Sequence, residues 1–192
     1  MGQEAKTKYL EDLDVLLKPH GFRRRRNQQE WKRRADSANE FWIHVNFGLS
    51  VVNPSIGVQY LDLLALLPPQ SGSVTGTMIM LSSLLERPPL YTIENGSVPV
   101  AHDLRDKGLP MFSNLGDREF VIEALKSNVP LDWPVVSYSH RIRLLPLLLA
   151  NEGRIDEALS LIEMFLPESL GRDQILPGYQ VFETTFCKRF GI

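Results

Sequence analysis

Apolar residues recur at two different spacings along the chain, and one of them marks a clear strand. From Phe41 to Val51 every second residue is apolar, and the residues between them are Trp42, His44, Asn46, Gly48 and Ser50. Side chains of a strand alternate between the two faces of a sheet, so this stretch predicts a half-buried strand. Asn53-Pro54 then predicts a turn, and the alternation of Ile56, Val58 and Tyr60 predicts an antiparallel return strand.

A helix and a short hairpin are expected before this strand. Residues 4–18 have apolar positions at three- and four-residue spacing and are followed by a proline and a glycine, which predicts a helix that ends there. The segments Phe22–Arg26 and Gln29–Arg34 flank a short polar turn. They predict a hairpin with Phe22 and Trp31 facing inward.

The middle of the chain is less regular. Thr77–Leu85 begins with β-branched residues but continues in a helix-like pattern, so both a strand and a helix are compatible with it. Leu90–Ile93 predicts a short strand, and Asn95-Gly96 predicts a turn. Ser97–Lys107 predicts a helix, and Gly108 is expected to end it.

The remaining segments are expected to be helical. Asp117–Ser127 predicts one helix, with Asp117 near its N-cap. Ser139–Asn151 and Asp156–Leu166 predict a helical hairpin with Gly153 at the turn. The last segment, Tyr179–Phe190, has aromatic residues at helical spacing.

The predicted fold class is therefore α+β, an antiparallel sheet packed by helices with a C-terminal helical hairpin annex. A chain of 192 residues is long enough for one core with such an annex. Val129–Val135 contains two prolines around Trp133. This segment predicts a boundary between an α+β domain of residues 1–128 and a helical extension of residues 129–192 packed on it.

Composition points to an ordinary globular protein. Apolar residues make up 43% and charged residues 23% of the chain, which is typical of a folded domain. The single cysteine, Cys187, cannot form an internal disulfide. No apolar run reaches the roughly 20 residues of a membrane span, and the N-terminus lacks the apolar core of a secretory signal. We expect a cytoplasmic protein that does not enter a membrane.

Several short motifs follow one another in a recognisable order. After the first helix come Leu17–Arg24, an aromatic strand around Trp31, the sequence Val45–Gly48 and later Gly108–Phe112. This order resembles a bacterial domain-of-unknown-function family, the one numbered four-three-zero-four, over roughly residues 9–125. The resemblance implies an α+β fold and a bacterial cytoplasmic setting, and it supplies no catalytic residues.

Basic residues gather in the predicted hairpin. Seven of them face a single acid, Glu30, between positions 21 and 34. The candidate partner-binding residues are Arg23, Arg24, Arg25, Arg26, Trp31, Lys32, Arg33 and Arg34. A hairpin would present them as a cationic ribbon with Trp31 interleaved, able to bind an acidic protein or phosphates. The alternative is an edge strand whose charged side chains prevent aggregation and pair with nearby acids.

Catalytic chemistry has little support in the sequence. The four histidines are scattered without a second ligand at metal-binding spacing, and no cofactor motif is present, so we expect neither a metal nor a cofactor. His44 and Asn46 share the polar face of the predicted strand. Together with Tyr60 they mark a candidate cleft, which would suit a small hydrolase or a nucleotide-handling enzyme.

The sequence favours a non-enzymatic protein-binding module, an immunity-type or adaptor protein. Its partner would be another protein with an acidic surface, bound through the basic hairpin. The two alternatives are an enzyme with a cleft near His44 and a nucleic-acid-associated protein that uses the same arginines. The net charge of −2 disfavours nucleic acid, since dedicated nucleic-acid binders are strongly basic.

Overall fold

The computed structural model describes residues 2–190 except 26–27, 68–73, 128–137 and 171–175. The chain forms two compact units, which are described separately. Among the described residues, the first unit holds 2–59 and 77–117, and the second holds 60–76, 118–127 and 138–190. The predicted domain boundary between residues 128 and 129 lies outside the described residues.

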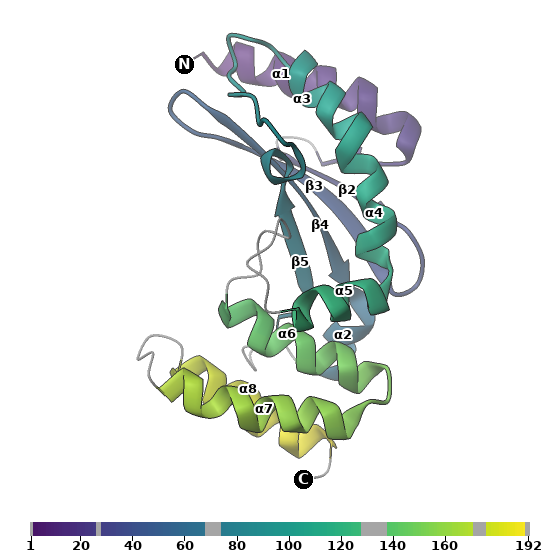
Figure 1. The fold of residues 1–192 in the computed structure, drawn as a ribbon. Coiled ribbons are helices and arrows are strands. Elements are labelled where there is room, and N and C mark those ends of the chain that lie inside the picture. The colour runs from purple at the N-terminus through teal and green to yellow at the C-terminus, as the bar shows by residue number, and fades with distance from the viewer. Residues whose placement is uncertain (1, 26–27, 68–73, 128–137, 171–175, 191–192) are drawn as a thin grey trace. The chain divides into compact units, whose positions relative to one another are not determined.

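The first unit is built on a five-stranded antiparallel sheet in which every strand lies beside its neighbours in sequence (Figure 1). The strands are β1 (Arg23–Arg24), β2 (Glu30–Arg34), β3 (Asn39–Phe47), β4 (Val52–Tyr60) and β5 (Gly76–Met80). The predicted hairpin is confirmed as β1 and β2, and the predicted strand and its return strand are confirmed as β3 and β4. Short connections join β1 to β2, β2 to β3 and β3 to β4, as is usual for antiparallel neighbours.

Helices cover one face of this sheet. The helical elements are α1 (Gln3–Leu17), η1 (Lys18–His20), η3 (Leu81–Leu84), α3 (Val98–Asp103), η4 (Leu104–Gly108) and α4 (Leu109–Gly116). The ring of Phe112 from α4 lies 4.8 Å from that of Phe41 and 5.3 Å from that of Phe22. Tyr9 from α1 meets Phe47 edge-on at 5.5 Å. The alternating apolar residues of β3 therefore pack against α1 and α4, as amphipathic strands and helices do.

Two predicted boundaries around β3 are wrong. The strand was expected to continue to Val51, but it ends at Phe47, and Leu49 is fully exposed. The amide of Gly48 donates to the carbonyl of Val51 at 2.9 Å, so the chain reverses there. Asn53-Pro54 was expected to form the turn, but it lies inside β4. Proline is tolerated near the start of a strand, where a missing amide costs less.

Three further predictions concern the segment after β5. Thr77–Leu85 contains both elements that its sequence allowed, the end of β5 and then η3. Leu90–Ile93 forms no strand, although the carbonyl of Tyr91 accepts a hydrogen bond from Val52. Gly108 does not end the helix, because it has right-handed helical dihedrals and α4 follows directly. It is buried at a close approach to Leu104.

The elements that lie wholly within the described part of the second unit are helices. Its elements are α2 (Leu61–Leu66), α5 (Arg118–Lys126), α6 (Tyr138–Asn151), α7 (Ile155–Leu170) and α8 (Leu176–Phe190). The predicted helical hairpin is confirmed as α6 and α7. Gly153 has φ +77°, and its amide donates to Ala150. Glycine adopts this left-handed conformation without strain, which explains the sharp turn.

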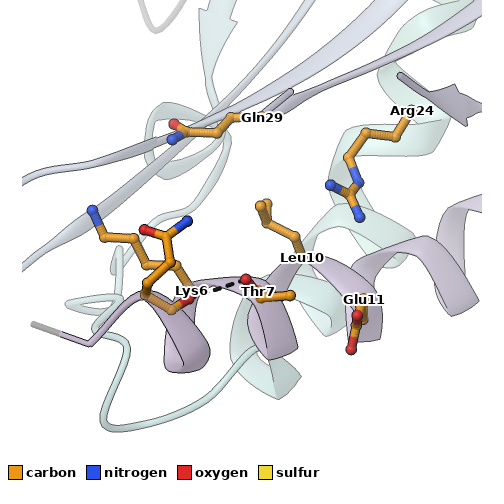
Figure 2. Close-up of a pocket in the computed structure, with 7 residues that line it drawn as sticks. Lys6, Thr7, Leu10, Glu11, Arg24 and Gln29 are labelled. Atoms are coloured by element: carbon orange, nitrogen blue, oxygen red, sulfur yellow. Dashed lines mark hydrogen bonds between the residues drawn. The ribbon is translucent and has the colours of Figure 1, made fainter. Parts of the chain in front are cut away.

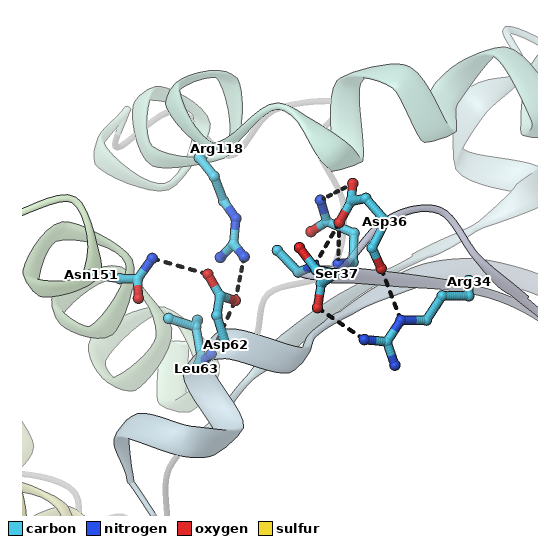
Figure 3. Close-up of polar contacts among 9 residues, drawn as sticks. Arg34, Asp36, Ser37, Asp62, Leu63, Arg118 and Asn151 are labelled. Carbon is cyan, nitrogen blue, oxygen red and sulfur yellow. Dashed lines mark hydrogen bonds and ion pairs between the residues drawn. The ribbon is translucent and has the colours of Figure 1, made fainter.

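A polar cluster links helices within this second unit. Asp62 of α2 accepts hydrogen bonds from Arg118 at 2.5 Å and from Asn151 at 3.0 Å (Figure 3). The guanidinium of Arg118 also lies 3.9 Å from the ring centre of Tyr60, which is fully buried. The cluster thus joins α2, α5 and α6.

The predicted α+β fold class is confirmed by this combination of an antiparallel sheet and helices. None of the helices in the described part of the chain is both long enough and apolar enough to cross a membrane.

Candidate partner-binding surface

The strand register divides the basic residues of the hairpin between two faces of the sheet. Arg23 pairs with Lys32, which pairs with Trp42, whereas Arg24 pairs with Trp31. Cross-strand partners point to the same face, and successive residues point to opposite faces. Trp31 is only 1% exposed, so its face is the one turned to the helices. We call this the inner face, and it carries Arg24, Trp31 and Arg33. The outer face carries Arg23, Glu30, Lys32, Arg34, Glu40, Trp42 and His44.

Arg24 is held on the inner face by a carboxylate of α1. Its Nε and Nη2 donate to the two oxygens of Asp14 at 3.0 and 2.5 Å, and the indole of Trp31 donates to the same carboxylate at 2.6 Å. The paired carboxylate raises the pKa of Arg24. Partial burial alone would raise the pKa of Asp14, but the hydrogen bonds from Arg24 and Trp31 outweigh it and lower that pKa. This geometry stabilises the fold.

Arg33 lies against aromatic rings on the same face. Its guanidinium carbon is 4.8 Å from the ring centre of Phe22, 5.2 Å from that of Phe41 and 5.8 Å from that of Phe112. Nη1 donates to the carbonyl of His20 at 3.1 Å. Burial lowers the pKa of Arg33. Its contacts with the three rings are cation–π contacts in the core. Arg24 and Arg33 are therefore committed to packing.

The outer face places two like charges directly opposite each other. Arg23 and Lys32 occupy one cross-strand row, and Trp42 continues the row on β3. Both basic residues are exposed, and Trp42 is half-buried. Like charges at this position repel each other, so the arrangement weakens the sheet on its own. Two members of the row, the arginine and the tryptophan, are of types that are enriched in protein interfaces.

Neighbouring groups moderate this charge. Lys32 lies 3.2 Å from Glu30 and 3.3 Å from Glu40. Partial burial works against it, but the two carboxylates together raise the pKa of Lys32. Arg34 donates to the backbone carbonyls of Asp36 and Ser37, at 2.8 and 3.0 Å (Figure 3). The two carboxylates thus favour the charged form of Lys32, and the two carbonyls orient Arg34.

The remaining basic residues lie beside this surface. Arg23 donates through Nη1 to the carbonyls of Lys18 and Phe22, at 3.1 and 3.0 Å. Arg25 is exposed just beyond the end of β1. Arg26 lies outside the described residues.

A glycine fixes the orientation of Trp42. A Cβ at Gly57 of β4 would lie 2.2 Å from Cζ2 of Trp42 and 2.5 Å from the carbonyl oxygen of Thr77. Any larger residue would therefore clash with the indole or with the backbone of β5. Since Gly57 leaves this space, the ring of Trp42 packs directly onto the neighbouring strand. An aromatic side chain held in this way loses little conformational entropy when a partner binds.

The predicted cleft residues are placed in different environments. His44 lines a shallow hollow of about 370 Å³ together with Gln28, Gln29 and Glu30. Asn46 is exposed farther along β3, and neither it nor Tyr60 is among the described residues that line this hollow. Tyr60 is 0% exposed, and burial raises the pKa of its hydroxyl. Of the three, only His44 borders the hollow.

A second hollow lies between α1 and the hairpin. It has a volume of about 420 Å³ and is lined by Gln3, Lys6, Thr7, Leu10, Glu11, Arg24 and Gln29. We call it the α1 pocket. Figure 2 shows Leu10 between two groups of polar side chains, with Lys6 and Gln29 in one group and Arg24 and Glu11 in the other. Gln29 lines both this pocket and the hollow beside His44.

Comparisons of the chain with protein-family models, with curated proteins and with solved structures return no match. The resemblance described above therefore stays an expectation. Within the described residues, no group of three or more histidine, cysteine, aspartate or glutamate side chains could hold a metal ion. The geometry of the hairpin surface is thus the main guide to function.

Two residues of this surface were missed in the sequence. Trp42 stands on the polar face of the predicted strand, and pairing that strand with the hairpin in register would have placed it beside the basic residues. Lys6 lies on α1, and no local pattern connects it to the hairpin. Its position in the pocket with Gln29 depends on how α1 packs against the hairpin (Figure 2).

Proposed function

We propose that this protein is a non-enzymatic binding module that recognises an acidic protein surface through the outer face of its hairpin. The observation that supports the proposal is the row Arg23–Lys32–Trp42. Two exposed basic residues are placed opposite each other on neighbouring strands, and a preoriented tryptophan lies beside them. Tryptophan and arginine are the side chains most often found at the energetic centre of protein interfaces.

Acidic partners fit this row better than nucleic acid does. Glu30 and Glu40 lie within 3.3 Å of Lys32 and would repel the continuous negative charge of a phosphate backbone. Discrete acidic side chains of a protein can avoid these two positions while contacting Arg23 and Lys32. Recognition of this kind gives specificity through complementary charge.

The test uses variants of the outer face in a capture experiment with lysate of the host cell. The double charge reversal Arg23→Glu/Lys32→Glu and the single change Trp42→Ala are compared with the wild-type protein. The control is Lys8→Glu/Lys107→Glu, which changes the charge equally at two exposed residues of the same unit outside the hairpin. Retained proteins are quantified by mass spectrometry, and circular dichroism checks that each variant is folded.

We expect at least one protein to be retained by the wild type and the control but lost from both outer-face variants. Loss of an interface tryptophan typically costs 2 kcal/mol or more, about 30-fold in affinity. Equal retention by all variants would contradict the proposal. So would retention that disappears after nuclease treatment, because it would identify nucleic acid as the ligand.

A further inference from the structure

The α1 pocket concentrates hydrogen-bond donors at one end. Lys6 and Gln3 come from the first turns of α1, and Gln29 comes from the residue before β2. Figure 2 shows Lys6 and Gln29 extending on the same side of Leu10. One ammonium and two carboxamides supply donors without a fixed carboxylate among them, and the start of α1 adds positive potential.

Lys6 has a charge that the protein does not neutralise by contact. Within the described part of the chain it forms no ion pair, and its ammonium lies 5.4 Å from the ring centre of Phe47. This cation–π contact restrains the side chain but leaves its donors unused. Arg24, the other cation of the pocket, already donates to both oxygens of Asp14. The available positive charge is therefore at the Lys6 end.

Glu11 limits what the pocket can accept. It lines the opposite end beside Arg24, where it would repel a second negative group. An isolated carboxylate over the floor of Leu10 fits this distribution, whereas a polyanion would meet Glu11. The volume of about 420 Å³ suits a single side chain with its flanking backbone.

We propose that the α1 pocket binds the carboxylate of one acidic side chain of the protein partner, with the ammonium of Lys6 as its counter-ion. This inference rests on the proposed function, because the pocket shares Gln29 with the hollow that His44 and Glu30 line on the outer face. It adds a specific anchoring position for one glutamate or aspartate. Gln3 and Gln29 hold the carboxylate by hydrogen bonds, and Leu10 contacts its methylene groups.

The experiment titrates the full chain with two matched probes and follows the backbone and glutamine side-chain amides by NMR. The probes are N-acetylglutamate amide and N-acetylglutamine amide, which have nearly the same shape but differ in charge. Inorganic phosphate is titrated separately. Lys6→Met removes the ammonium and keeps the apolar stem, and Gln29→Ala tests a second contact. The matched control is Lys8→Met, on the same helix but outside the described lining of the pocket.

The glutamate probe is expected to give saturable shifts at Gln3, Thr7 and Gln29 with millimolar affinity, and the glutamine probe is expected to give none. Lys6→Met should weaken binding about tenfold, the usual effect of losing a charge-assisted hydrogen bond. Lys8→Met should leave the affinity unchanged.

Three results would overturn the inference. They are the absence of saturable shifts in the pocket, equal binding by wild type and Lys6→Met, and phosphate binding as strong as that of the glutamate probe with the same dependence on Lys6. Shifts confined to Arg23, Lys32 and Trp42 would reject the pocket but leave the proposed function standing. Failure of the capture experiment alone would reject the proposed function.

Discussion

The inner and outer faces of one hairpin carry the same types of residue, but these residues have different roles on the two faces. On the inner face, Arg24 is bound to Asp14, and Arg33 lies over three aromatic rings. On the outer face, Arg23 and Lys32 are exposed and face each other across the strands. A one-residue step along a strand thus decides whether an arginine stabilises the core or remains available to a partner.

The comparison changes which residues a binding experiment should alter. Charge reversal at Arg24 or Arg33 would place a carboxylate beside Asp14 or among aromatic rings, and the hairpin would be disturbed. A loss of binding in such a variant could then reflect unfolding. Reversal at Arg23 and Lys32 changes the surface alone, which is why the proposed test uses those positions.

The largest expected difference between the faces involves their tryptophans. Trp31 is 1% exposed and donates to Asp14, so Trp31→Ala should lower the free energy of unfolding by about 4 kcal/mol. Trp42 is half-buried, and Trp42→Ala should cost about 1 kcal/mol. Urea denaturation followed by circular dichroism measures both. Similar losses for the two variants would show that the faces are not distinct.

A smaller difference is expected between two neighbouring arginines. Arg33→Ala removes the cation–π contacts and the packing of the stem, and we expect a loss of about 1–2 kcal/mol. Arg34 is exposed and bonded to two loop carbonyls, and Arg34→Ala should change stability by no more than about 0.5 kcal/mol. Thermal and urea unfolding of the two variants provide the measurement.

A third variant separates the contributions at this position. Arg33→Met keeps most of the apolar stem and removes the charge, so it should fall between the wild type and Arg33→Ala. If Arg33→Met were as stable as the wild type, packing of the stem alone would account for the contribution of Arg33 to stability. An effect of Arg34→Ala as large as that of Arg33→Ala would contradict the assignment of the two faces.

The sequence predicted the elements well where the apolar pattern was long or where a turn required a particular residue, such as glycine. The strand around Ile43, the basic hairpin and the left-handed turn at Gly153 were all anticipated. One error occurred where a tertiary contact overrides a local signal. Gly108 resembles a helix end in sequence, but it is a close-packing position within a continuous helical run.

The candidate surface was predicted only in outline. The cluster of basic residues was evident, but their division between two faces depends on the register and on distant partners. Arg24 is held by Asp14 on α1, and Arg33 contacts Phe112 on α4. No local spacing in the sequence reveals either contact. Trp31 was expected to lie among the exposed cations, yet its own predicted inward orientation already excluded that role.

The smallest expected effect is the acid sensitivity that the inner face adds to the fold. The hydrogen bonds from Arg24 and Trp31 lower the pKa of Asp14, so at mildly acidic pH the unfolded chain binds more protons there than the folded protein does. The stabilisation is therefore complete above the ordinary aspartate pKa of about 4 and is lost as the pH falls through the lower folded value. Asp14→Asn should be less stable at pH 7, by about 1 kcal/mol or less because the carboxylate is partly exposed.

This difference between Asp14→Asn and the wild type should shrink as the pH falls from 5 to 2. Urea denaturation at a series of pH values measures it, and Glu11→Gln is the control because Glu11 is exposed one turn before the hairpin contact. The other carboxylates are present in all three proteins, so their titration cancels in the comparison. A difference in stability that stayed constant down to pH 2 would mean that Asp14 stabilises the fold through its shape rather than its charge. The ion pair between Asp14 and Arg24 would then not explain the stability of the inner face.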